Sequence, residues 1–130
     1  AYITKIVNQV RYVEELIHRY DWELLSQDFR KTIAEAGKDD FLYCDPPYIG
    51  RHANYFDTWT EKDEYDLYLM LSRFEGKFIL STWQKDKHRE NEYIKKFWSR
   101  FHIITRNHLY YVGGKEVKRK PIIEALIMNF

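Results

Sequence analysis

The short apolar run Phe41–Cys44 constrains the fold most, because a rigid segment ends it at once. Asp45 follows the run directly, and Pro46 and Pro47 come next. Proline has a fixed φ and lacks an N–H, so neither proline can continue a central strand. A continuous apolar run of this length is typical of a strand that is buried on both faces of a parallel sheet.

Helices and strands alternate along the rest of the chain. Apolar residues recur at three- and four-residue steps over Tyr2–Tyr20, which predicts an amphipathic helix whose apolar face packs in the core. Thr60 and Asp63 resemble a capping box, which predicts a helix over Glu61–Phe74. The expected core face of that helix is Tyr65, Leu67, Tyr68, Leu69 and Leu71. Further helices are expected over 30–36 and 88–98, and further strands over 22–26, 77–82, 101–112 and 121–130, with a tight turn at Gly113–Gly114.

This order predicts an α/β fold with a mainly parallel sheet and an antiparallel hairpin at its C-terminal edge. The 130 residues are enough for one domain with a buried core. Cys44 is the single cysteine and lies in an apolar run, so we expect a core residue, no internal disulfide and a cytoplasmic protein. The histidines lack the spacing of metal ligands, and no apolar run has the length of a membrane span, so neither a metal nor a membrane is expected.

The residues after the apolar run predict a binding site for a planar amine. Ligands of open α/β sheets bind outside the carboxyl ends of the strands, where Asp45 is expected. The Pro46–Pro47 pair holds the chain extended with its carbonyls free, and Tyr48 adds a flat ring. A carboxylate, a fixed carbonyl and a ring match the exocyclic amine of a nucleobase. Two accepted hydrogen bonds would free the amine's lone pair for nucleophilic attack.

The Asp45-Pro46-Pro47-Tyr48 motif resembles the catalytic motif of amino-methyltransferases, in particular the Dam-like adenine-N6 DNA methyltransferases of the D12 class (alpha group). The flanks agree, because an acid at Asp28 precedes the motif, an Asn/Tyr/Phe-containing loop follows it, and a basic turn near the C-terminus closes the pattern. The resemblance covers nearly the whole chain. It implies a Rossmann-like methyltransferase sheet, S-adenosylmethionine as cofactor, and double-stranded DNA with a flipped adenine as substrate.

The resemblance also implies roles for individual residues. The catalytic set is Asp45, Pro46, Pro47 and Tyr48, and the cofactor-binding set is Asp28, Phe29 and Asp45. Two further groups are expected on DNA, namely the loop residues Arg51, His52, Asn54 and Tyr55 with neighbouring Phe56, and the basic residues Lys115, Lys118, Arg119 and Lys120. Ordinary alternatives stay open: Asp28 as a simple strand end with Phe29 in the core, and the two DNA groups as solvated loops.

One element of the family is not found in the sequence, the glycine-rich motif that cradles the methionine part of the cofactor. We therefore expect residues 1–130 to be the C-terminal part of a catalytic domain, which is an incomplete fold. The N-terminal glycine motif and the DNA-recognition domain would be absent, and the chain alone would be inactive. Partners would be the missing N-terminal part or a restriction enzyme. The alternatives are a non-catalytic nucleic-acid-binding remnant, and an RNA adenine or cytosine-N4 methyltransferase.

Overall fold

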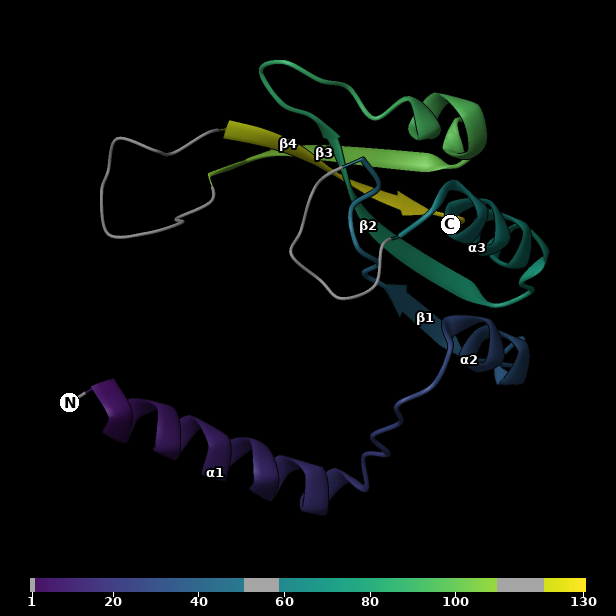
Figure 1. The fold of residues 1–130 in the computed structure, drawn as a ribbon. Helices are drawn as coiled ribbons and strands as arrows, with labels where there is room; N and C mark the ends of the chain where they lie inside the picture. The colour runs from purple at the N-terminus through teal and green to yellow at the C-terminus, as the bar shows by residue number, and fades with distance from the viewer. Residues whose placement is uncertain (1, 51–58, 110–120) are drawn as a thin grey trace.

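The computed structural model of this chain describes residues 2–50, 59–109 and 121–130 (Figure 1). The elements in chain order are α1 (Tyr2–Tyr20), α2 (Phe29–Glu35), β1 (Phe41–Cys44), α3 (Glu61–Arg73), β2 (Lys77–Lys85), the π-helix η1 (Ile94–Trp98), β3 (His102–Leu109) and β4 (Pro121–Met128). The α/β class expected from the sequence is confirmed. The tight turn expected at Gly113–Gly114 lies outside the described residues.

The four strands form one sheet in the order β1-β2-β4-β3. β1 pairs parallel with β2, whereas β4 pairs antiparallel with both β2 and β3. The sheet is therefore mixed rather than mainly parallel. The expected C-terminal hairpin is present, but its second strand is inserted beside β2 and is not at the edge. This central place buries Ala125 and Ile127 of β4, which an edge position would leave more exposed.

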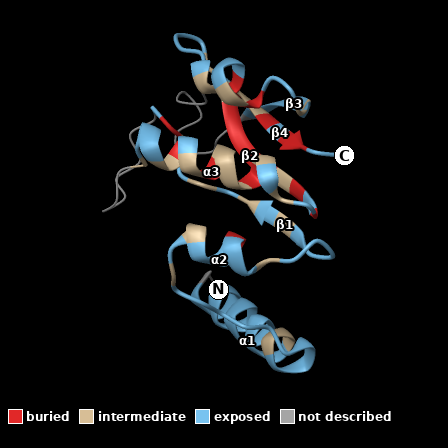
Figure 2. Cartoon of the chain, turned by 90° about the vertical axis from the view of Figure 1, so that its right-hand side faces the viewer, coloured by how far each residue is buried: buried red, intermediate tan, exposed pale blue. Residues whose placement is uncertain are grey.

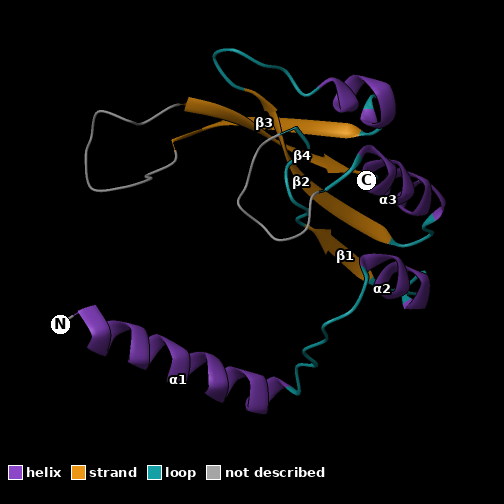
Figure 3. Ribbon diagram, in the orientation of Figure 1, coloured by secondary structure: helices purple, strands orange, loops and turns teal. Residues whose placement is uncertain are grey.

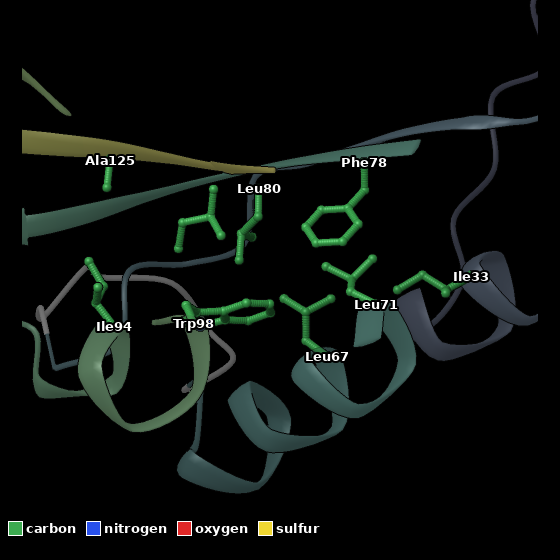
Figure 4. Close-up of a cluster of buried hydrophobic side chains, with 9 residues drawn as sticks. Ile33, Leu67, Leu71, Phe78, Leu80, Ile94, Trp98 and Ala125 are labelled. Carbon is green, nitrogen blue, oxygen red and sulfur yellow. The ribbon is translucent and has the colours of Figure 1, made fainter. Parts of the chain in front are cut away.

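One face of the sheet is covered by α2, α3 and η1, and the hydrophobic core lies between these two layers (Figure 4). β2 contributes Phe78 and Leu80 to this core, α3 contributes Leu67 and Leu71, and η1 contributes Trp98. The core also contains Ile33, Ile94, Ala125 and Ile127. Cys44 packs against it as expected, and burial raises the pKa of its thiol to about 11.

The opposite face of the sheet carries exposed residues of β1, and no residue of this strand is fully buried (Figure 2). Exposure alternates along this strand, with Phe41 and Tyr43 exposed and Leu42 and Cys44 half-buried. The expectation that this strand is buried on both faces is therefore wrong, because the described helices α2, α3 and η1 cover only one side. β1 is also the edge strand of the described sheet.

The helix expected over Tyr2–Tyr20 is confirmed as α1, but its apolar face is not in the core. Ile3, Val10 and Val13 are all exposed. Residues 22–26 form a loop between α1 and α2 and not the expected strand (Figure 3). A strand needs neighbouring hydrogen-bond partners, and none of the described strands pairs with this segment.

Two helices differ in detail from expectation. The capping box at Thr60 and Asp63 is present at the start of α3. Leu67 and Leu71 are buried as expected, but Tyr65 is exposed and Glu64 is buried in its place. The helix expected over 88–98 is reduced to the π-helix η1 and the residues just before it.

Candidate active site

β1 places Asp45 at the carboxyl end of the sheet's one parallel pair. Cys44 is the last residue of the strand, so the backbone of Asp45 leaves the sheet directly. The side chain of Asp45 is exposed, Pro46 is half-buried and Pro47 is exposed. The carboxylate predicted to be catalytic is therefore accessible to a ligand at the end of β1.

The loop after the prolines is held by hydrogen bonds with β4, with β2 and with Arg89, which follows β2. The hydroxyl of Tyr48 donates to Glu124 Oε1 on β4 over 3.1 Å. The indole Nε1 of Trp83 on β2 donates to the carbonyl oxygen of Ile49 over 2.8 Å. Arg89 Nη1 donates to the carbonyl oxygen of Gly50 over 2.9 Å. Three consecutive residues of the loop are thus fixed by side chains far away in the sequence.

Gly50, which follows Ile49, has a left-handed conformation with φ 73°. Side chains with a Cβ rarely adopt this φ, so glycine is required here by conformation. A Cβ at this position would meet Trp83 at an ordinary contact distance of 4.0 Å, so space is not the reason.

Sequence reasoning missed Trp83, Arg89 and Glu124. Two of these residues have sequence positions that could have pointed to a role in the site. Trp83 lies towards the carboxyl end of β2, the strand next to β1, where ligand sites of parallel strands gather. Glu124 is the single acid in the otherwise apolar strand β4.

Asp28 caps the N-terminus of α2. Its Oδ1 accepts from the backbone N–H of Arg30 over 2.8 Å, and its Oδ2 lies 3.1 Å from the guanidinium Nη1 of the same residue. The residue is exposed. The ordinary alternative, a strand end, is wrong, because this position begins a helix. Asp28 and Asp45 lie on different elements and share no hydrogen bond in the part of the chain that the structure describes.

Phe29 is half-buried between two neighbours. Its ring centroid lies 5.3 Å from that of Trp59, and the guanidinium of Arg30 lies 4.4 Å from its ring centroid. Phe29 thus packs against the core, as the ordinary alternative expected. Its backbone stays next to the exposed carboxylate of Asp28.

Arg30 connects the start of α2 to the start of α3. It donates to Asp63 Oδ1 over 2.6 Å and to Asp66 Oδ2 over 2.8 Å. The hydrogen bonds with Asp63 and Asp66 raise the pKa of Arg30. Hydrogen bonds from the Thr60 side chain and from Arg30 lower the pKa of Asp63 to about 2. This ion-pair cluster fixes the helix end that carries Asp28.

Glu64 is a buried carboxylate, 3% exposed, that accepts from two indoles. Trp59 Nε1 donates to its Oε2 over 2.8 Å, and Trp98 Nε1 donates to its Oε1 over 2.9 Å. Both oxygens are therefore satisfied, as a buried carboxylate requires. Through Trp59 this bond also holds the surface against which Phe29 packs.

The predicted DNA-contacting residues lie outside the described residues. They are Arg51, His52, Asn54, Tyr55 and Phe56 in the loop after the motif, and Lys115, Lys118, Arg119 and Lys120 before β4. Across residues 2–50, 59–109 and 121–130, no group of three or more His, Cys, Asp or Glu side chains could hold a metal ion. No helix among these residues is long and apolar enough to cross a membrane.

Comparison with known proteins relates this chain to DNA methyltransferases. Residues 2–112 match the family model of the D12 class N6 adenine-specific DNA methyltransferases. The chain is also 25% identical over 126 residues to the type II methyltransferase M.FokI of Planomicrobium okeanokoites, an alignment that covers 89% of this chain. The chain spans only 20% of the length of that relative. Because the family model matches most of the chain and includes the Asp45–Tyr48 motif, this protein belongs to the D12 class N6 adenine-specific DNA methyltransferase family.

Proposed function

We propose that the polypeptide containing these 130 residues transfers a methyl group from S-adenosylmethionine to N6 of adenine in double-stranded DNA. One observation carries the proposal, the Asp45–Tyr48 motif at the carboxyl end of β1 in a member of this family. The carboxylate of Asp45 is exposed, and the loop after it is fixed from the sheet. This is the arrangement that a preorganised amine-binding site needs.

The chemistry requires a more nucleophilic N6 amine. The lone pair of an aryl amine is delocalised into the ring, which makes the free amine a poor nucleophile. Asp45 and the carbonyl of Pro46 would each accept one of its two hydrogens and favour a pyramidal nitrogen. Attack would then form a bond between N6 and the methyl carbon while the bond from that carbon to the sulfonium sulfur breaks in line with it, leaving a neutral thioether, and the nitrogen would give up one proton to solvent. No covalent enzyme intermediate is needed.

The available carboxylates fit the hydrogen-bond donors of the cofactor. When bound, S-adenosylmethionine supplies a methyl group on a positively charged sulfur. A carboxylate offers roughly four lone-pair sites, so Asp28 keeps acceptor capacity beyond its contacts with Arg30. We propose that Asp28 accepts from the adenine amine of the cofactor, with the backbone of Phe29 nearby, and that Asp45 faces both cofactor and substrate.

The target adenine would reach Asp45 only after it leaves the DNA stack. Flipping costs a few kcal/mol, which stacking on the ring of Tyr48 would partly offset. The loop residues Arg51, His52, Asn54 and Tyr55 would order around the displaced base. The basic residues Lys115, Lys118, Arg119 and Lys120 would contact phosphates, which would make binding sensitive to salt.

We further propose that residues 1–130 supply the C-terminal part of a methyltransferase catalytic domain with a Rossmann-like sheet. The glycine-rich cofactor motif and a DNA-recognition domain would come from another segment. The short span relative to M.FokI and the open face of β1 support this division. The relative's designation as a type II methyltransferase supports a place in a restriction-modification system.

The test is methyl transfer from labelled S-adenosylmethionine to mixed-sequence duplex DNA, with the polypeptide as the cell makes it. Digestion then identifies the labelled nucleoside. We expect label in N6-methyladenine from DNA. Label in N4-methylcytosine, or no label in the DNA, would each contradict the proposed function.

A further inference from the structure

We propose that Glu124 is a positioning residue for methyl transfer, which acts by fixing the ring of Tyr48. The inference rests on the proposed function, because it concerns the ring on which the target adenine would stack. The hydroxyl of Tyr48 donates to Glu124 Oε1 over 3.1 Å. Both residues are half-buried, and 76 positions of sequence separate them. A hydrogen bond to a carboxylate is roughly twice as strong as one between neutral groups.

Glu124 lies in a strand that is paired on both sides. β4 is hydrogen-bonded on both sides, and Glu124 is paired with Trp83 of β2 and with Arg106 of β3. The β4 residues Ala125 and Ile127 are buried in the core, although the pairing with β2 shifts register between Trp83 and Lys85. The hydrogen bond from Tyr48 thus connects the loop to a central strand of the sheet.

Two neighbouring residues of one cross-strand row hold two consecutive residues of the loop. Trp83 binds the carbonyl of Ile49, and its register partner Glu124 binds the hydroxyl of Tyr48. The Ile49 backbone and the Tyr48 side chain are thus both held by this one pair of facing residues. Trp83 is itself buried, and so is Ile49. This arrangement gives the one acid of strand β4 a partner in the loop.

The expected consequence is a ring that is oriented before the base arrives. The tether acts at the phenol oxygen, at the far end of the side chain, so it restricts swinging of the ring. A base that stacks on a fixed ring loses less conformational freedom on binding than one that must also order the ring. The effect should appear in the reacting complex, since a misplaced base lies badly for in-line attack.

The experiment is a double-substitution cycle with Tyr48→Phe and Glu124→Leu in the polypeptide as the cell makes it. Tyr48→Phe removes the hydroxyl and leaves the ring, so β4 is untouched. Each single variant should lower kcat by about 10-fold, with KM for S-adenosylmethionine changed less than about 2-fold. The double variant should be no slower than the slower single variant, because both substitutions remove the same hydrogen bond between Tyr48 and Glu124. Glu124→Gln is the matched control, since its amide oxygen still accepts, and it should keep more than about half of the activity.

A second readout follows the base and does not depend on turnover. Once the position of the target adenine in duplex DNA has been mapped, that adenine is replaced with 2-aminopurine, whose fluorescence is quenched when the flipped base stacks on an aromatic ring. Tyr48→Phe and Glu124→Leu should each raise the fluorescence of the bound duplex, and Glu124→Gln should not. A general loss of fold at Glu124 would not reproduce this pattern, because Tyr48→Phe leaves the sheet intact.

Several results would overturn the inference. If the wild-type polypeptide methylates adenine but Tyr48→Phe has wild-type kcat and fluorescence, the tether has no positioning role. Additive losses in the double variant, or equal losses for Glu124→Gln and Glu124→Leu, would show that Glu124 acts elsewhere. If the wild-type polypeptide itself transfers no methyl group to DNA, the proposed function fails first and this inference fails with it.

Discussion

The two faces of the sheet differ in how they are stabilised. On one face, β2 and β4 direct Phe78, Leu80 and Ile127 into a core beneath α2, α3 and η1. On the other face, Phe41 and Tyr43 of β1 and Leu126 of β4 remain exposed. The Asp45–Tyr48 loop leaves the sheet at the end of β1 and is held by Trp83 and Glu124 rather than by the helical layer. The comparison separates residues that stabilise the fold from residues that shape the site.

The largest expected effect is the loss of Trp98 from the covered face. This side chain is 0% exposed and packs between Tyr68 and Phe101. Trp98→Ala should lower the free energy of unfolding by about 3–5 kcal/mol. The matched variant Tyr43→Ala removes a ring that is 62% exposed on the open face, and should cost less than about 0.5 kcal/mol. Urea denaturation of both variants checks the contrast, and equal losses would show that the open face is covered in solution.

The next largest loss of stability is expected for Glu64, the buried carboxylate of α3 in the helical layer. Glu64→Ala would leave the indole N–H groups of half-buried Trp59 and buried Trp98 without their acceptor. The expected loss is about 3 kcal/mol, because each buried unsatisfied donor costs about 1–3 kcal/mol. Glu64→Gln keeps one carbonyl acceptor and should lose clearly less. Urea denaturation followed by tryptophan fluorescence checks both variants, and no difference between them would contradict the role of the carboxylate.

The capping box and ion pairs of the helical layer predict a loss of stability in acid. The Thr60 side chain and Arg30 lower the pKa of Asp63 from 3.8 to about 2 in the folded chain. A lowered folded-state pKa means that the contribution is complete above pH ~4 and is lost as the pH falls towards 2. The expected loss is about 1–2 kcal/mol. Unfolding measured between pH 5 and pH 2 tests this, and Asp63→Asn should flatten the profile in that window. A variant profile as steep as that of the wild type would assign the acid sensitivity to other groups.

These results show which parts of the fold were predictable from sequence. Local signals worked: the capping box at Thr60 and Asp63 and the short strand Phe41–Cys44 are both present. Properties that depend on distant partners were not predictable. The segment 22–26 has strand-like composition but pairs with no described strand, and the apolar stripe of α1 has no described layer to pack against.

The same distinction between local and distant features applies to the candidate site. The motif Asp45–Tyr48 could be identified from the sequence because proline rigidity and a strand end are local features. The loop that begins with this motif is held by Trp83, Arg89 and Glu124. These residues lie 34, 39 and 76 positions along the sequence from the loop residues that they contact, so only folding brings them together. For Asp28 the ordinary alternative of a strand end is wrong, because its side chain accepts a hydrogen bond from the backbone N–H of Arg30 and caps a helix.

The smallest expected effect is on α1. Val10 is 63% exposed, so Val10→Ala removes little buried surface and slightly favours the helix. The free energy of unfolding should change by less than about 0.5 kcal/mol in either direction. Denaturation of the 130-residue chain measures this. A loss of 1 kcal/mol or more would mean that the apolar stripe of α1 is buried against a partner in solution.

The most direct test of the central claim is the rate of methyl transfer to adenine in duplex DNA by Asp45→Ala, in the polypeptide as the cell makes it. Asp39→Ala is the matched control, because Asp39 is an exposed aspartate in the turn before β1. If Asp45 accepts from the target amine, Asp45→Ala should lower kcat by at least about 100-fold, while Asp39→Ala keeps the wild-type rate. Unimpaired transfer by Asp45→Ala would contradict the account of the site.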